Sequence, residues 1–339
     1  MSSPDPARPP GMYDVARLAG VSHQTVSRVI NAHPNVAQET RRRVEEAILT
    51  LGYRRNVAAR TLVTRHSNTV GVITGVSVEW GPAMALVGVE RAARDAGFYV
   101  SVAGLDTIEP GGVREVIGHF ADQGVEGIVV IAPEAAMAHM AEPFVTGVPV
   151  VMVAAGAQPA DGVHVTAIDQ RRGARLATGH LADLGHTRIG HIAGPDPWFD
   201  AIERVHGWRD ELRERRLRPG PLLRGDWTAD SGYRLGGQLL RRGQPPTAMF
   251  VANDLMAMGF VRALHEAGVR VPEDVSIVGF DDIPGVGYLI PALTTVRQDL
   301  NRLGRQCIDM LLAHLQQSPA EFPLVEPVLV VRDSARPPS

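Results

Sequence analysis

Apolar residues near the start of the chain repeat at helical spacing and stop at a glycine. Val15, Leu18 and Ala19 fall on one side of a short predicted helix. Gly20 follows them, and glycine adopts turn conformations without steric cost. Ser22 can then cap a second helix by accepting a hydrogen bond from one of its first free amides. The pattern predicts two short helices joined by a turn.

The second helix carries its apolar and polar side chains on opposite faces. Val26, Val29 and Ile30 share one face. The other face is polar and consists of His23, Gln24, Ser27, Arg28 and Asn31. A third helix over residues 38–51 offers the apolar stripe that a small three-helix core needs. Ala37, just before it, has no capping oxygen, which should cost that helix about 1 kcal/mol.

The chemistry of the polar face suits the edges of DNA bases. Arginine can donate two hydrogen bonds to guanine, and glutamine can pair with adenine. A helix-turn-helix places the first residues of its second helix in the major groove. Residues 1–66 hold ten arginines against five acidic residues, although the whole chain has a net charge of −3. This part of the sequence therefore predicts a unit that binds double-stranded DNA; the alternative is a solvated helical hairpin.

From residue 68 onward, apolar runs of strand length alternate with amphipathic stretches of helix length. The strand-like runs are 69–76, 99–103, 127–132, 148–153, 163–168, 188–193, 248–252, 275–280 and 327–331. Strict alternation predicts parallel sheets with helices on both faces. Because so many units exceed one sheet, we expect an α/β core of two doubly wound subdomains. A ligand would then bind in the cleft between them.

Several other classes of protein are disfavoured. The single cysteine, Cys307, allows no internal disulfide. No run of about 18 apolar residues occurs, so we expect no membrane span. The proline-rich start indicates a flexible tail rather than a signal peptide. We therefore expect a soluble protein of the cytoplasm.

Metal, nucleotide and catalytic sites are not expected either. His180, His186 and His191 are spaced by six and five residues, unlike a helical pair of metal ligands. The glycine-rich stretches match no nucleotide-binding fingerprint, so we expect no cofactor. Adjacent carboxylates such as those of Asp281 and Asp282 point apart, which disfavours a glycosidase. The sequence favours a binding protein over an enzyme.

A series of short motifs runs in a fixed order through the chain. They occupy residues 13–31, 148–149, 184–186, 193–195, 207–208, 225–227, 246–254, 278–282 and 291–299. Through these motifs the chain resembles the lactose-repressor/galactose-repressor (LacI/GalR) family of transcriptional regulators from about residue 12 to 333. The resemblance implies a helix-turn-helix head joined to a periplasmic-binding-protein-like core.

The resemblance also implies a division of the chain. We expect a flexible tail (1–11), the DNA-binding domain (12–55), a hinge helix and linker (56–66), the effector-binding core (67–333) and a final tail (334–339). Within the core, an N-subdomain is expected over 68–167 and 298–325, and a C-subdomain over 168–297 and 326–333.

In the head, the resemblance assigns two sets of DNA contacts. The positions that read bases are His23, Gln24 and Arg28. The positions that contact the phosphate backbone are Tyr13, Ser22, Thr25, Ser27 and Asn31.

The hinge helix of this family folds on operator DNA and enters the minor groove. Residues 56–63 match it, with Asn56 and Ala59 in the segment and Leu62 at the position of a leucine that wedges between bases. A segment this short is unstable as an isolated helix. The alternative is an ordinary linker.

A sugar pocket needs charged or amide groups for paired hydrogen bonds and an aromatic plate. Arg204, Asn253, Asp281 and Gln298 supply the first, and Trp227 supplies the second. The resemblance matches these residues to ligand-contacting positions. Taken singly, each also has a structural interpretation, as a helix cap, a surface ion pair or a core side chain.

The other wall of the cleft departs from the pattern that the chain resembles. Ala154 stands in place of a carboxylate, Ile131 in place of an asparagine, and Asp200 in place of a small hydroxyl residue. The sequence therefore predicts a small-molecule effector that is a sugar but need not be the same galactoside, and it leaves the identity of the sugar open.

The expected function is that of a sugar-responsive repressor that binds a near-palindromic operator as a homodimer and is released by its saccharide inducer. A dimer is expected because residues after 316 are rich in proline and form no leucine heptad. One alternative is a corepressor mode, in which the ligand strengthens DNA binding. Another is a sugar-binding transport protein with the same core.

Overall fold

The computed structural model describes residues 10–31, 33–53, 66–75, 79–105, 110–132, 147–157, 163–243, 245–318 and 320–338. The chain divides into two compact units, residues 1–67 and 68–339. Asn56, Ala59 and Leu62 of the predicted hinge helix lie outside the described residues, as do residues 1–9 of the predicted tail.

The described residues of the first unit form three helices around a small core. They are α1 (Met12–Ala19), α2 (His23–Ile30) and α3 (Gln38–Leu51). Val15, Val26 and Val44, one from each helix, are fully buried at its centre. The predicted three-helix head is therefore present.

The turn between α1 and α2 follows the sequence prediction. Gly20 has a φ of 63°, in the left-handed region that favours glycine. The Ser22 hydroxyl accepts a hydrogen bond from the Thr25 amide at 3.1 Å, and Ala37 makes no side-chain cap for α3. Leu18 differs from the prediction, because its side chain is 52% exposed and Ala16 is buried instead. An eight-residue helix presents only a narrow stripe to the core, and the stripe here is Val15, Ala16 and Ala19.

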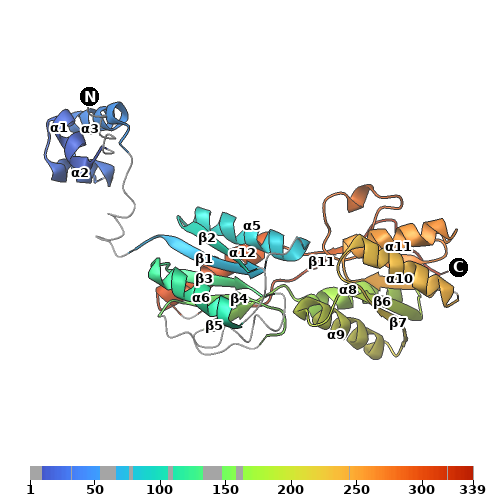
Figure 1. Ribbon diagram of the computed structural model, residues 1–339. Coiled ribbons are helices and arrows are strands. Elements are labelled where there is room, and N and C mark those ends of the chain that lie inside the picture. Colours follow the sequence, from blue (N-terminus) through green and yellow to red (C-terminus); the bar gives the residue numbers. More distant parts are fainter. Residues whose placement is uncertain are drawn as a thin grey trace, which may run out of the picture. The chain divides into compact units, whose positions relative to one another are not determined.

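The second unit is built on two parallel sheets (Figure 1). The first has the strand order β2-β1-β3-β4-β5, and the second has the order β7-β6-β8-β9. The strands are β1 (Thr69–Gly75), β2 (Tyr99–Leu105), β3 (Gly127–Ile131), β4 (Val150–Val153), β5 (Val163–Thr166), β6 (Arg188–Ala193), β7 (Arg218–Arg224), β8 (Ala248–Val251) and β9 (Ser276–Val278). Two doubly wound sheets, as predicted, form this unit.

Helices cover both faces of each sheet. On the first sheet, α5 and α12 pack on one face and α6 on the other. On the second, α8 and α9 pack on one face and α10 and α11 on the other. Their bounds are α5 (Trp80–Asp95), α6 (Pro110–Asp122), α8 (Gln170–Asp183), α9 (Phe199–Glu214), α10 (Ala229–Arg241), α11 (Asp254–Glu266) and α12 (Leu300–Leu315).

Helix α12 follows the second sheet in sequence but packs on the first. It crosses α5 closely, and a Cβ at Gly304 would meet the backbone of Gly88 at 2.1 Å. Just before α12, β10 (Thr295–Arg297) pairs antiparallel with β11 (Val328–Val330). After β10 the chain crosses to the first sheet, where it forms α12. Before β11 it crosses back to the second sheet, so two further segments connect the sheets.

The C-terminal segment is not the tail that the sequence predicts. Ser334 is buried; its hydroxyl donates to the Ile277 carbonyl at 2.7 Å and accepts from the Thr294 amide at 2.8 Å. The Arg336 carbonyl oxygen lies 2.9 Å from His186 Nε2. These contacts fix the segment to the second sheet because they satisfy polar groups that burial would otherwise leave unpaired.

No helix among the described residues is both long enough and apolar enough to cross a lipid bilayer.

Candidate functional site

The predicted DNA-binding side chains gather on α2 and its N-terminal cap. Gln24 and Arg28, four residues apart, are both exposed and project from the same side of the helix. His23 stacks on the Tyr13 ring of α1, with centroids 4.5 Å apart. The remaining predicted contacts, Ser22, Thr25, Ser27 and Asn31, lie on the cap and the same short helix. Seven of the eight residues therefore lie on α2 or at its two cap positions, and Tyr13 contacts this helix from α1.

Most of the predicted effector residues line a cavity between the two sheets of the second unit. The walls from the first sheet include Glu79, Trp80 and Pro82, at or just before the start of α5. The walls from the second sheet are Trp198, Asp200, Arg204, Trp227, Asn253, Leu255 and Asp281. An adjoining lobe lies deeper against the first sheet and contains Gln170 and Gln298.

The cavity is small as it stands. Its free volume is about 40 Å³, with about 50 Å³ in the adjoining lobe. Water-sized voids begin at about 10–15 Å³ and ligand pockets span about 300–1,000 Å³. As it stands, the cavity is therefore smaller than a typical ligand pocket.

Arg204 lies at the centre of the polar wall and is only 3% exposed. Its Nε donates to Gln170 Oε1 at 2.9 Å, and its Nη1 donates to the Ala252 carbonyl. Its guanidinium carbon lies 3.8 Å from the centroid of the Phe280 ring. Since a guanidinium cannot lose its proton in a protein, this side chain is a fixed, oriented positive charge.

Two carboxylates share that charge. Asp200 Oδ2 and Asp281 Oδ1 lie 3.6 and 3.7 Å from Arg204 Nη2. Burial raises the pKa of Asp281 to about 7, although Arg204 acts in the opposite direction. Burial likewise raises the pKa of Asp200 against the pull of Arg204. One guanidinium therefore compensates only part of the negative charge of this wall.

Gln298 joins this group as predicted. Its Nε2 donates to Asp281 Oδ1 at 2.7 Å, and its Oε1 accepts from Gln170 Nε2 at 2.8 Å. Gln170 also lies 3.1 Å from Asp200 Oδ2. The amides and the carboxylates thus form one connected network around Arg204.

Gln170 was missed by the sequence reasoning. It begins α8 directly after Asp169, whose side chain caps that helix. A glutamine at the first turn of a helix that follows a buried strand was the available signal. Trp198, Glu79 and Trp80 were missed as well, since nothing in their spacing links them to the other wall.

Asn253 and Trp227 lie at the cavity, and Asn253 also has a structural role. Its Oδ1 accepts from the Met256 amide at 2.9 Å and so caps α11, while its Nδ2 donates to the Trp227 carbonyl at 2.9 Å. The Trp227 ring rests on Gly194, where an added Cβ would lie 2.2 Å from the ring. Trp227 also meets Trp198 edge to face at 5.6 Å. The predicted aromatic plate is therefore one of a pair.

Ile131 and Ala154, which stand in place of polar residues of the resembled pattern, have apolar surroundings in the structure. Ile131 lines the deeper lobe beside Val153 and Ala155. Ala154 is buried next to them in the core of the first sheet. This wall offers hydrophobic contact where the resembled pattern has polar groups.

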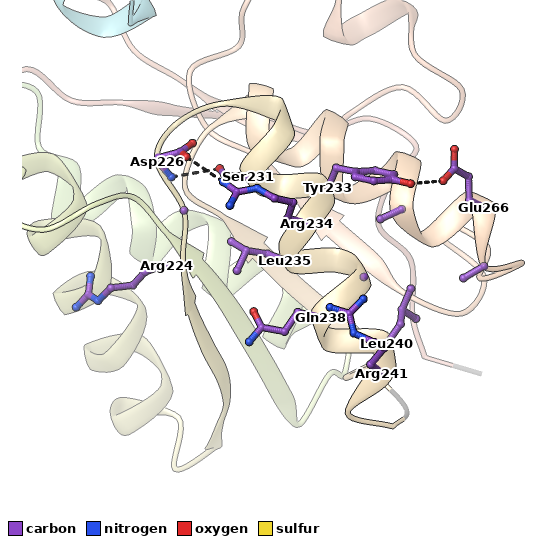
Figure 2. A pocket seen from close by; sticks show the side chains of 14 residues that line it. Arg224, Asp226, Ser231, Tyr233, Arg234, Leu235, Gln238, Leu240, Arg241 and Glu266 are labelled. Carbon is purple, nitrogen blue, oxygen red and sulfur yellow. Dashed lines mark hydrogen bonds and ion pairs between the residues drawn. The ribbon is translucent and has the colours of Figure 1, made fainter.

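A larger hollow of the second unit lies elsewhere, on α10 and α11 (Figure 2). Its volume is about 830 Å³. Several of its polar side chains are partnered, as in the pairs Arg234–Asp226 and Tyr233–Glu266. The predicted effector residues instead lie at the smaller cavity, where charged groups and aromatic rings converge. Among the described residues, no three or more His, Cys, Asp or Glu side chains lie close enough together to hold a metal ion.

Comparison with known proteins identifies the family. Residues 11–56 match the model of the bacterial regulatory proteins of the lacI family, and residues 178–335 match a periplasmic binding protein-like domain. The chain is 34% identical to the lactose operon repressor of Escherichia coli (strain K12) over 326 residues, 96% of this chain and 90% of that protein. This protein belongs to the LacI family of transcriptional regulators.

Solved structures show the same relationship. The Lac repressor bound to ONPG in the repressed state has a TM-score of 0.88 and 34% identity, covering 97% of this chain and all of that one. A complex of the transcriptional regulator CelR with cellobiose has a TM-score of 0.70 and 33% identity, covering 96% and 100%. The family membership makes the chain a DNA-binding, ligand-modulated repressor rather than a transport protein.

Proposed function

We propose that this protein represses transcription from a near-palindromic operator as a homodimer and is released when a saccharide binds the cavity around Arg204. The observation that carries the proposal is the network of Arg204, Asp281, Gln298 and Gln170. It presents charged and amide groups beside Trp227, which is the combination that sugar hydroxyls and a sugar ring face require.

The relatives support a saccharide. One solved neighbour holds cellobiose and another holds ONPG. We assign effector contacts to Arg204, Asp281, Gln298, Asn253, Trp227 and Asp200, and we add Gln170 and Trp198 to that set. In the head we assign base reading to His23, Gln24 and Arg28, with Tyr13, Ser22, Thr25, Ser27 and Asn31 on the phosphate backbone.

The mechanism we propose is linkage between the cavity and the hinge. A ligand can shift a conformational equilibrium only by its difference in affinity for the two states. The cavity of about 40 Å³ excludes a sugar, so a bound sugar selects a different arrangement of the two sheets. We assign residues 56–66, with Asn56, Ala59 and Leu62, to the segment that transmits this change to DNA. Sugar binding and operator binding then oppose each other by the same coupling free energy.

This function involves no catalytic step and no cofactor. We place it in the cytoplasm, the bacterial compartment that holds operator DNA.

The test begins with the operator. Selection of binding sites from a random DNA pool with the full-length chain should return a site with two inverted half-sites, as a symmetric dimer requires. Fluorescence anisotropy with that site should then show weaker binding as a saccharide is added. A saccharide that tightens binding would show the corepressor mode, and a chain that selects no DNA would overturn the proposal.

A further inference from the structure

The effector cavity holds more negative than positive charge. Among the described residues that line it and its adjoining lobe, Glu79, Asp200 and Asp281 are acidic and Arg204 alone is basic. Arg204 already makes two hydrogen bonds, to Gln170 and to the Ala252 carbonyl, and lies over Phe280. Asp200 and Asp281 already share its positive charge, so the third carboxylate of the cavity has no basic side chain of the lining left to compensate it.

Glu79 is the third acidic residue of the cavity. Its Oε2 is buried without a hydrogen-bond partner among the described residues. Leaving a buried acceptor unsatisfied costs about 1–3 kcal/mol, and more when the acceptor is charged. Such an atom in the wall of a cavity is a place where a donor is expected.

Aromatic rings surround the same space. Three of the four tryptophans of the chain, Trp80, Trp198 and Trp227, line this cavity. Trp198 and Trp227 meet edge to face, and the buried indole N–H of Trp227 has no hydrogen-bond partner among the described residues. The faces of tryptophan rings attract organic cations more strongly than those of tyrosine or phenylalanine.

We propose that the effector is a saccharide that carries a protonated amino group, an amino sugar, and that its ammonium group binds against Glu79 and the tryptophan rings. This inference rests on the proposed function, because it names the class of saccharide for the same site. The hydroxyls of the sugar meet Arg204, Asp281 and the amides, and the ammonium supplies the charge and the donors that Glu79 lacks. A hydrated metal ion fits less well, because the indole walls cannot replace its water ligands.

The pKa values of the carboxylates agree with a site that holds less positive than negative charge. Burial raises the pKa of both Asp200 and Asp281 even though Arg204 lies beside them. A bound ammonium would favour the charged form of these carboxylates.

The experiment compares matched sugars on the full-length protein. Isothermal titration calorimetry and operator release are measured with glucose and glucosamine, galactose and galactosamine, and cellobiose and the β-1,4 dimer of glucosamine. Each amino sugar differs from its parent by amino groups in place of hydroxyls, so shape is nearly constant. We expect the amino member of a binding pair to bind about tenfold tighter or more, which corresponds to one cation–π contact in a desolvated site.

Two variants identify the carboxylate. E79Q should reduce the preference for the amino sugar about tenfold, since it removes the charge and keeps the shape. E115Q is the matched control, because Glu115 is exposed on α6 of the same sheet and lines neither lobe; it should leave the preference unchanged. A preference that persists in E79Q would overturn the role of Glu79.

The outcomes separate the two proposals. A neutral sugar that binds as tightly as its amino counterpart and releases the operator overturns the charged effector and leaves the saccharide-responsive repressor standing. Failure of all six sugars to bind overturns both.

Discussion

The imidazole of His23 lies stacked on the phenol ring of Tyr13, with ring centroids 4.5 Å apart and planes inclined by 23°. The two residues come from different helices, α1 and α2. Aromatic pairs of this kind contribute about 0.5–1.5 kcal/mol beyond the area they bury. The stack therefore restricts the orientation of a side chain that we assign to base reading.

Replacing Tyr13 by alanine should reduce operator selectivity. Without the stack, His23 gains rotamer freedom, and the ratio of operator to random-sequence affinity should fall about fivefold. Tyr13→Phe keeps the ring and removes the hydroxyl, so it should weaken binding to both DNAs alike and preserve the ratio. Fluorescence anisotropy with the two DNAs measures this. A ratio unchanged in Tyr13→Ala would refute a positioning role for the stack.

Arg204→Ala should abolish the response to the effector while operator affinity persists. The substitution removes the charge that Asp200 and Asp281 share, and we expect effector affinity to fall about 100-fold or more. The head is a separate compact unit, so its DNA contacts remain. Arg213→Ala is a suitable control because Arg213 lies exposed on the same helix, away from the cavity. Normal operator release by Arg204→Ala would remove this residue from the site.

Gly194→Ala should displace the Trp227 ring. The added methyl would lie 2.2 Å from the ring, so the indole must move or the sheet must shift. We expect destabilisation by about 1–3 kcal/mol, as for other overpacked cores, together with weaker effector binding. Urea denaturation and tryptophan fluorescence report the two effects. Gly237→Ala is the comparison, because its Cβ would meet only an arginine tip at 3.4 Å. Equal behaviour of the two variants would contradict a tight fit at Gly194.

Asp254 should make stability depend on pH. Burial raises its pKa to about 8 from an ordinary 3.8, and the charge of Asp281 adds to the shift. A carboxyl group whose pKa is raised by folding stabilises the protein at low pH; here that stability is lost progressively between about pH 3.8 and 8, and no more is lost above pH 8, where both states are ionised. The slope should reach about 1.4 kcal/mol per pH unit. His191 contributes with the opposite sign, but its pKa is lowered to about 3 from 6.5, so its effect ends near pH 6.5.

The test is urea unfolding between pH 6.5 and 8.5 for the wild type and Asp254→Asn. Asparagine can accept from the Ile283 amide and donate to the Thr295 hydroxyl, the two partners that Asp254 has now. It should therefore fold and show a flatter profile. Asp274→Asn is the control, because pairing with Arg270 lowers the pKa of Asp274 to about 2 and both states are ionised in this range. A wild-type slope retained in Asp254→Asn would exclude Asp254 as its source.

The proposed homodimer predicts a role for an apolar loop of the second unit. Tyr288 ends the short helix η1 (Val286–Tyr288) and Ile290 lies two residues further on; they are 92% and 97% exposed. Large apolar side chains this exposed are typical of interaction surfaces. Ile290→Asp should shift the protein from dimer to monomer in analytical ultracentrifugation and weaken operator binding. Val331→Asp changes an exposed apolar residue elsewhere and should leave the dimer intact; dissociation by both variants, or by neither, would argue against this surface.

Local patterns were enough to predict the head. Its helices are short, its turn needs a left-handed residue at Gly20, and Ser22 caps the next helix with its own side chain. All these interactions lie within a few residues of one another. Even so, periodicity misplaced Leu18, because only the packing of three helices decides which part of a short helix is covered.

The core shows a similar division. The alternation of strands and helices predicted two parallel sheets, since hydrophobic period and length are properties of the sequence itself. The C-terminal segment was predicted as a tail because its composition is polar and proline-rich. Its burial depends on partners such as Ile277 and His186, which lie far away in the chain.

The sequence by itself therefore determined the fold class, the helix to which we assign base reading, and the polar residues Arg204, Asp281 and Gln298, which stand in motifs. Only the tertiary structure added Gln170, Glu79, Trp80 and Trp198, because their role depends on which side chains meet across two sheets. Burial also decided the charge of the site. The pKa of an Asp or Glu side chain shifts, and its partners are set, only when folding excludes water from around it.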